Sequence, residues 1–164
     1  MRYLLDANIF IQAQNLHYGM DFCPAFWDFL KQEATMNRLF STDMVYDELK
    51  VYNDEVSRWV IENRDLLFTI SSEDAETQSK FSEIANFTNS HTTYKASEKG
   101  RFLDGADPWL IATASTMRLT IVTHETLVSP NSTKVKIPNV AREFEVNWIN
   151  PYEMIRRLGG QFIL

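Results

Sequence analysis

The chain has 164 residues, about the length of one ordinary domain, and 45% of them are hydrophobic, which excludes a disordered or fibrous protein. Lys and Arg number 16 against 22 Asp and Glu, so the net charge is −6 and the chain has no overall attraction for nucleic acid. The one cysteine, Cys23, excludes an internal disulfide and a cysteine-rich zinc cluster, and it favours a reducing, cytoplasmic setting. The apolar runs are too short to predict a membrane span.

Strands and helices are predicted to alternate along the chain. Short apolar or β-branched runs predict strands over residues 2–5, 39–42, 66–70 and 119–123. Helical spacing of apolar residues predicts helices over 21–36, from 42 or 43 to 52, around 59, from 71 or 72 to 85, over 108–117, and between the Asn150-Pro151 and Gly159-Gly160 pairs. The polar segment 86–102 is expected to be an irregular connection or a partly helical flap. This order favours one α/β domain over residues 1–164, with a mainly parallel sheet flanked by helices.

Polar residues follow the first and the last predicted strands. Asp6 comes directly after the first, with Asn8 two residues further on, and Thr123-His124-Glu125 closes the last. Ligands collect outside the carboxyl ends of strands in parallel sheets, so these positions point to a site. Asp6 and Asn8 are equally typical of the start of a helix, where Asp and Asn act as caps.

Two further acids are associated with predicted helices. Asp107 immediately precedes Pro108, and Asp104 lies three residues earlier. Taken alone, this pair is more typical of a turn and a helix start than of a functional site. Glu48 lies at the border of an apolar helical stripe, whereas Asp47 is expected to face water.

Gathered in one pocket, Asp6, Glu48, Asp107 and Glu125 would raise one another's pKa values unless a cation balanced their charge. Carboxylate ligands without Cys or paired His favour Mg²⁺ or Mn²⁺ over Zn²⁺. The three histidines lack the spacing of a metal-binding helix; they are His17, His91 and His124. The hypothesis is that the acids hold one or two such ions, which activate water for attack on a phosphate.

Four segments together resemble the PIN-domain family of metal-dependent ribonucleases. They are YLLDANIFI (3–11), MVYDELK (44–50), DGADPWLIATA (104–114) and IVTHE (121–125), which come in the family's order and span most of the chain. The Pro-Trp after Asp107, the Thr-His-Glu turn and the tail KIPNVAREFEVNWINPYEMIRRLGG (136–160) are further similar to the DUF4411 subgroup.

The resemblance implies a PIN-like three-layer sandwich and roles for particular residues. Asp6, Glu48 and Asp107 match the three core catalytic and metal-binding acids, and Glu125 matches the fourth, where many relatives carry Asp or Asn. Thr123 and Asn8 match supporting polar residues, and Asp104 is an extra acid beside the third position. The implied activity is Mg²⁺- or Mn²⁺-dependent endoribonucleolytic cleavage that leaves 5′-phosphate and 3′-hydroxyl ends. The implied role is the toxin of a type II toxin–antitoxin system, with RNA as substrate, a protein antitoxin as partner, and a homodimer as the expected assembly.

The basic residues Lys95, Lys99 and Arg101, with Tyr94 and Phe102 beside them, are candidates for binding RNA at the rim, although a solvated flap explains them equally well.

Other functions are alternatives at this point. A non-catalytic PIN-like module that binds RNA or a protein is one. A haloacid-dehalogenase-type phosphatase is another, because Asp6-x-Asn8 after a strand is similar to its nucleophile loop, but Asn8 stands where that loop has its second Asp. The five glycines are not arranged as a nucleotide-binding phosphate loop.

Overall fold

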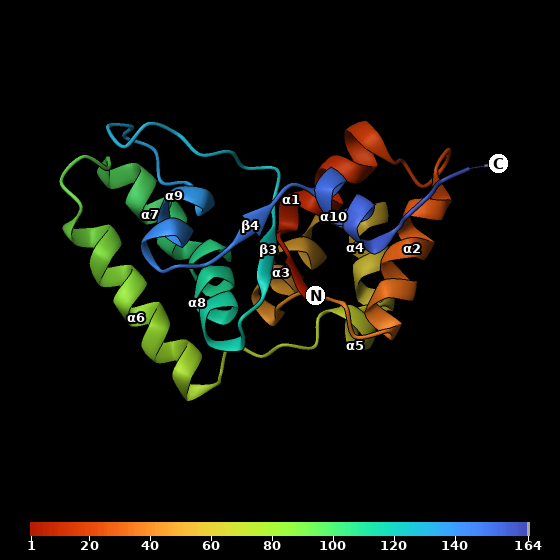
Figure 1. The fold of residues 1–164 in the computed structure, drawn as a ribbon, viewed down its shortest axis with the longest axis horizontal. Coiled ribbons are helices and arrows are strands. Elements are labelled where there is room, and N and C mark those ends of the chain that lie inside the picture. The colour runs from red at the N-terminus through yellow and green to blue at the C-terminus, as the bar shows by residue number, and fades with distance from the viewer. Residues whose placement is uncertain (164) are drawn as a thin grey trace.

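The computed structural model describes residues 1–163 and is built around a small parallel sheet (Figure 1). Within these residues the sheet has four strands in the order β2-β1-β3-β4, and every neighbouring pair is parallel. The strands are β1 (Tyr3–Leu5), β2 (Leu39–Phe40), β3 (Thr120–Val122) and β4 (Trp148–Ile149). The α/β fold class expected from the alternating pattern is confirmed.

Helices form a layer on either side of the sheet. In the view of Figure 1, α6 to α9 lie on the left, and α2, α4, α5 and α10 lie on the right. The helical segments are α1 (Ala7–Gln12), the π-helix η1 (Ala13–His17), α2 (Pro24–Thr35), α3 (Asp43–Leu49), the 3₁₀ turn η2 (Lys50–Tyr52), α4 (Glu55–Glu62), α5 (Arg64–Leu67), α6 (Ala75–Ser90), α7 (Ala96–Asp104), α8 (Asp107–Met117), α9 (Ile137–Glu143) and α10 (Pro151–Leu158). This is the three-layer, PIN-like arrangement. In the part of the chain described, no helix is long and apolar enough to cross a membrane.

The central strand β1 places the first acid of the site. Tyr3, Leu4 and Leu5 are completely buried, because helices cover both faces of the sheet and leave no polar side for an alternating pattern. The strand pairs with β3 from Tyr3 to Leu5, and the amide of Asp6 donates to the carbonyl of Val122 over 3.1 Å. The residues that follow β1 and β3 therefore lie side by side at one edge of the sheet.

One predicted strand is wrong. Residues 64–67 form the short helix α5, and of the predicted run 66–70 only Ile70 pairs with the sheet, in a bridge to Thr42. The amides of Leu66 and Leu67 donate back to the carbonyl of Asn63, so they are used in a helical turn. A short apolar segment such as 66–70 is compatible with either structure, and here the local turn prevails.

The segment expected to be irregular is largely helical. Helix α6 continues to Ser90, and α7 begins at Ala96 and runs to Asp104. Phe102 is completely buried, which anchors α7 to the core and accounts for a helix in such a polar stretch. Strand β4 and helix α9 were not predicted, because a two-residue strand and a seven-residue helix carry little periodic signal.

The core position of β1 gives a first prediction. Leu4→Ala should lower the free energy of unfolding by about 3 kcal/mol, because it leaves a cavity under helices on both sides. The exposed residue Val51 supplies the control, since Val51→Ala should change stability by less than about 0.5 kcal/mol. Urea denaturation of both variants checks this, and equal losses would contradict the described core.

Candidate active site at the carboxyl edge of the sheet

Asp6 is buried at the end of β1 with its carboxylate directed toward β3. It is 3% exposed, and its Oδ2 accepts a hydrogen bond of 2.7 Å from the hydroxyl of Thr123. Asp6 occupies the N-cap position of α1, yet within residues 1–163 its side chain bonds none of the first helical amides. The capping alternative therefore does not explain this carboxylate, and its orientation favours a functional role.

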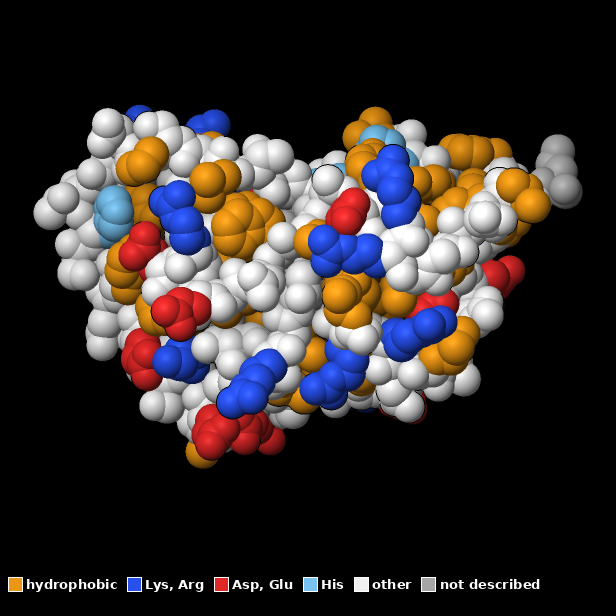
Figure 2. All heavy atoms as spheres, viewed as in Figure 1, with side chains coloured by type: hydrophobic (Ala, Val, Ile, Leu, Met, Phe, Trp, Pro, Cys, Tyr) orange, Lys and Arg blue, Asp and Glu red, His pale blue; other side chains and the backbone are white. Residues whose placement is uncertain are grey.

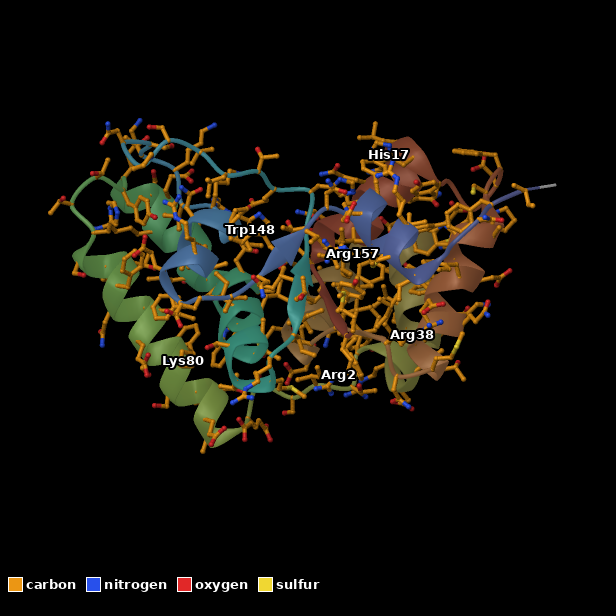
Figure 3. All side chains as sticks on the ribbon, viewed as in Figure 1. Arg2, His17, Arg38, Lys80, Trp148 and Arg157 are labelled. Atoms are coloured by element: carbon orange, nitrogen blue, oxygen red, sulfur yellow. The ribbon has the colours of Figure 1, made fainter. Side chains whose placement is uncertain are left out.

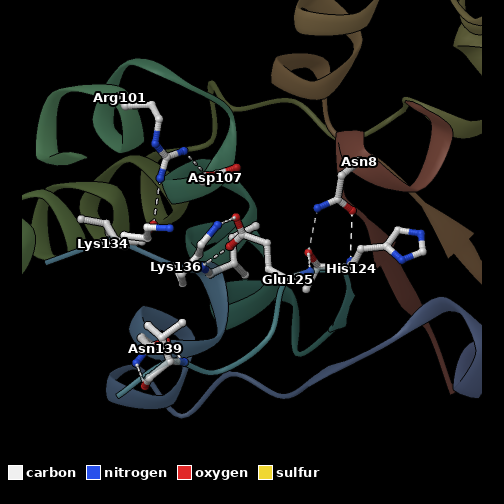
Figure 4. A network of polar contacts seen from close by, with 12 residues as sticks. Asn8, Arg101, Asp107, His124, Glu125, Lys134, Lys136 and Asn139 are labelled. Atoms are coloured by element: carbon white, nitrogen blue, oxygen red, sulfur yellow. Dashed lines mark hydrogen bonds and ion pairs between the residues drawn. The ribbon is translucent and has the colours of Figure 1, made fainter. Parts of the chain in front are cut away.

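Thr123 and Asn8 form a hydrogen-bonded group beside Asp6. Figure 4 shows Asn8 directed toward the turn that carries His124. The Thr123 hydroxyl accepts from Asn8 Nδ2 over 3.1 Å and from the amide of Glu125 over 3.0 Å, while it donates to Asp6. Asn8 Oδ1 accepts from the amide of His124 over 3.1 Å. Asn8 thus ties the start of α1 to the turn after β3 and holds Asp6 in a fixed orientation.

Asp107 lies in the first turn of α8 and faces the same edge. Ala106, not Asp107, is the N-cap of this helix, and Pro108 follows at a position that suits proline. The pKa of Asp107 is raised to about 7, mainly by burial and also by the charges of Glu125 and Glu48, while Arg101 and Lys136 lower it. The charges felt by Asp107 come from other elements, so the chain fold brings these acids together.

Asp6 responds to the same group of acids. Burial raises the pKa of Asp6 well above its ordinary value, the negative charges of Asp107, Glu125 and Glu48 add to the rise, and the hydrogen bond from Thr123 opposes it. Asp107 therefore lies close enough to Asp6 to disfavour its ionisation. The three core acids expected from the sequence share one electrostatic environment.

Glu48 approaches this environment from α3. Thr42 caps the helix by accepting from the amide of Val45, as expected for one of the two proposed caps, and this fixes where the helix begins. Asp47 is exposed and Glu48 is half-buried, so Glu48 faces inward as the periodicity indicated. Glu48 and Asp107 line one cavity of about 360 Å³, which Arg101 and the exposed Asp104 also border.

The fourth acid is held by the backbone and by a lysine. Glu125 Oε2 accepts from the amide of Ile137 over 2.7 Å, and its Oε1 lies 3.0 Å from the ammonium of Lys136. Glu125 therefore joins the turn after β3 to the first residue of α9. Lys136 was not assigned a role from the sequence, and the only available signal was its place just before the Ile-Pro start of a helix.

Arg101 is the predicted basic residue that reaches the acids. Its Nη1 lies 3.7 Å from Asp107 Oδ2, and its Nη2 donates to the carbonyl of Val135 over 2.8 Å. Lys99 instead donates to the carbonyl of Asn89, and Lys95 lies at the N-cap of α7.

The two aromatic residues proposed beside this basic group differ in exposure. Phe102 is part of the core, whereas Tyr94 is partly exposed and stacks on His91 with ring centroids 3.7 Å apart.

The donor set suits a hard divalent cation. Carboxylate oxygens are its preferred ligands, and buried acids that raise one another's pKa values are stabilised by a positive charge between them. Among residues 1–163, however, no three His, Cys, Asp or Glu side chains stand close enough together to hold a metal ion. Lys136 lies 3.0 Å from Glu125 and Arg101 lies 3.7 Å from Asp107, so two of the four acids face basic side chains.

The raised pKa of Asp107 gives a prediction about stability. Asp107 binds its proton more tightly in the folded chain, with a pKa of about 7 against 3.8 ordinarily. Without divalent cations, the contribution of this proton to the free energy of unfolding is therefore complete at low pH and is lost as the pH rises toward 7. Asp107→Asn cannot ionise, and between about pH 5 and pH 8 it should lose less stability than the native chain, by on the order of 1 kcal/mol. Urea denaturation in EDTA measures the difference.

Asp104→Asn is the matched control for this prediction. It removes the same charge from an exposed position on the same cavity, so it should keep the native pH dependence. If Asp107→Asn also keeps the native slope, Asp107 does not titrate as described.

Comparisons with known proteins agree with this architecture. The crystal structure of VapBC2 from Rickettsia felis, bound to a DNA fragment from their promoter, is similar with a TM-score of 0.57 and 18% identity, over 92% of this chain and 98% of that one. FitAcB from Neisseria gonorrhoeae is similar with a TM-score of 0.52, and its identity and coverage are the same. At this level of identity the two structures show the fold alone.

No curated protein matches the sequence. The family described as "Domain of unknown function (DUF4411)" matches residues 3–162, which is nearly the whole chain. This chain belongs to the DUF4411 family.

Proposed function

We propose that this protein is a Mg²⁺- or Mn²⁺-dependent endoribonuclease and the toxin of a toxin–antitoxin pair. The observation that carries the proposal is that Asp107 and Glu48, which come from two other elements, raise the pKa of the buried Asp6 at the carboxyl edge of the sheet. Glu48 also raises the pKa of Asp107, so this influence of the acids does not depend on any resemblance. A group of acids of this kind supports hydrolysis of a phosphodiester.

Asp6, Glu48 and Asp107 are the residues that would hold the cation. When bound, such an ion lowers the pKa of water and offsets negative charge on the attacked phosphate. Thr123 holds Asp6 in place, and Asn8 holds Thr123. Both Glu125 oxygens already accept hydrogen bonds, so we assign Glu125 the role of a nearby negative charge that positions Lys136.

The phosphate side of the substrate fits the two basic side chains of the site. Arg101 reaches Asp107 from α7, and Lys136 reaches Glu125 from the segment before α9 (Figure 4). Each is already directed at a carboxylate of the pocket, so each is placed to donate to a phosphate oxygen bound there. Local positive charge thus compensates for the negative charge of the whole chain.

A phosphatase of the haloacid-dehalogenase type fits less well. That chemistry needs an acid two residues after the nucleophile, and Asn8 occupies this position with both ends of its amide engaged by Thr123 and His124. Asn8 therefore has a structural role here, and an amide side chain cannot supply the acid–base step of that reaction.

Cleavage of total RNA tests the nuclease. The native chain with Mg²⁺ or Mn²⁺ should produce new 5′-phosphate ends, and Asp6→Asn or Glu48→Gln should lower the rate by on the order of 100-fold, because each removes a carboxylate from the site. Asp28→Asn is the matched control, since Asp28 is an exposed acid on α2 that pairs with Lys31 and does not line the cavity beside Glu48. Mapping the ends gives the cleavage position. RNA that is bound but never cut would show a non-catalytic module.

Growth of a bacterial host tests the toxin role. VapBC2, which shares this fold, was crystallised on a DNA fragment from its promoter, and we infer a comparable arrangement in which a protein partner accompanies this chain. Induced expression should arrest growth, and Asp6→Asn should relieve the arrest at equal protein level. Arrest that persists with Asp6→Asn would separate toxicity from the proposed active site.

A further inference from the structure

Three aromatic side chains meet next to the acids. His17 is the last residue of η1, His124 lies between Thr123 and Glu125, and Tyr152 lies in the first turn of α10. The rings of His17 and His124 are stacked with centroids 5.4 Å apart, and Tyr152 lies edge-on to both, at 5.8 and 6.1 Å. The Tyr152 hydroxyl is 3.3 Å from His17 Nε2. Residues more than a hundred positions apart thus form one aromatic cluster.

This cluster lies at the surface and is not part of the core. Tyr152 is 37% exposed and both histidines are partly exposed, whereas core rings such as those of Phe10 and Phe26 are almost fully covered. Figure 3 places His17 at the top of the molecule, and Figure 2 shows histidine surface open to solvent there. The three rings therefore leave aromatic area available to a ligand.

The backbone that carries His17 is unusual. Residues Ala13–His17 form a π-helix that continues α1, a rare conformation that occurs frequently at functional sites. The amide of Tyr18 donates to the carbonyl of Ala13 over 2.7 Å and closes the wide turn. This turn ends with His17 beside the segment that follows β3, where it meets His124.

The cluster is fixed relative to the acids. The amide of His124 donates to Asn8 Oδ1, and the flanking residues Thr123 and Glu125 both belong to the site. In the view of Figure 4, Arg101 and Lys136 lie on one side of Asp107 and Glu125, and His124 lies on the other. The site thus has a charged side that suits phosphate and an aromatic side that suits a base.

We propose that His17, His124 and Tyr152 form a stacking platform for a base of single-stranded RNA, next to the phosphate at the acids. The inference rests on the proposed nuclease function and names the substrate class. Bases in a duplex are already stacked on their neighbours, whereas an unpaired base can lie on aromatic side chains. Because every base has an aromatic face, the platform selects single strands without selecting a sequence. The chain has a net charge of −6, so only its local basic side chains attract the phosphates of RNA. Stacking adds affinity for RNA that does not depend on charge.

Binding of a fluorescein-labelled single-stranded RNA, followed by anisotropy in Ca²⁺, tests the platform. His17→Ala and Tyr152→Ala should each weaken binding about tenfold, within the range expected for one lost stacking contact. Binding of an abasic strand of the same length and charge should be weak and should not change. Tyr152→Phe keeps the ring and should restore the affinity lost in Tyr152→Ala. Tyr52→Ala is the matched control, because Tyr52 is an exposed tyrosine on η2, away from the cluster.

The outcomes separate this inference from the nuclease proposal, because binding is measured without cleavage. If the alanine variants bind RNA more weakly but the native chain cuts no RNA, the stacking proposal is supported and the nuclease proposal is overturned. Cleavage by the native chain, with native affinity in His17→Ala and Tyr152→Ala, overturns the platform and leaves the nuclease standing. Equal losses on the intact and abasic strands also overturn it, since the rings would then act without a base. Circular dichroism melting confirms that the variants are folded.

Discussion

The repulsion among carboxylates at one edge of the sheet is the constraint on which this molecule depends. Asp6 is almost fully buried, and the charge of Asp107 raises its pKa further. The pKa of Asp107 is also raised, although Arg101 and Lys136 lower it in part. Such an arrangement costs stability, so the surrounding structure has to hold it in place. The buried strand β1 and the hydrogen bond from Thr123 hold Asp6 in place. The Thr42 cap fixes the start of α3, which carries Glu48.

Basic side chains and acids have complementary places in this arrangement. Arg101 and Lys136 come from segments that follow α6 and precede α9, on the outer layer of the sandwich, while Asp6 and Thr123 come from the central strands. Arg101 and Lys136 thus supply the groups that suit a phosphate. The groups that suit a cation come from the end of β1, from α3 and from α8. The aromatic cluster adds a third contribution from α10 and the end of η1.

Much of the fold and site was predictable from the sequence. Asp6 and Thr123 follow buried strands, and Glu48 borders an apolar stripe, so simple periodicity places all three. The role of Lys136 was not predictable, because its partner Glu125 lies across an irregular segment whose path no local pattern fixes. The run 66–70 was misassigned because four apolar residues satisfy a strand and a buried helical turn equally well. The metal-binding roles of the acids stay predictions.

The contact between Glu125 and the start of α9 has a mechanical consequence. Residues 126–136 form no helix or strand, and Glu125 pins the two ends of this stretch together through Ile137 and Lys136. The same carboxylate raises the pKa of Asp6 and of Asp107. The path of a surface loop and the electrostatics of the acidic site therefore depend on one side chain.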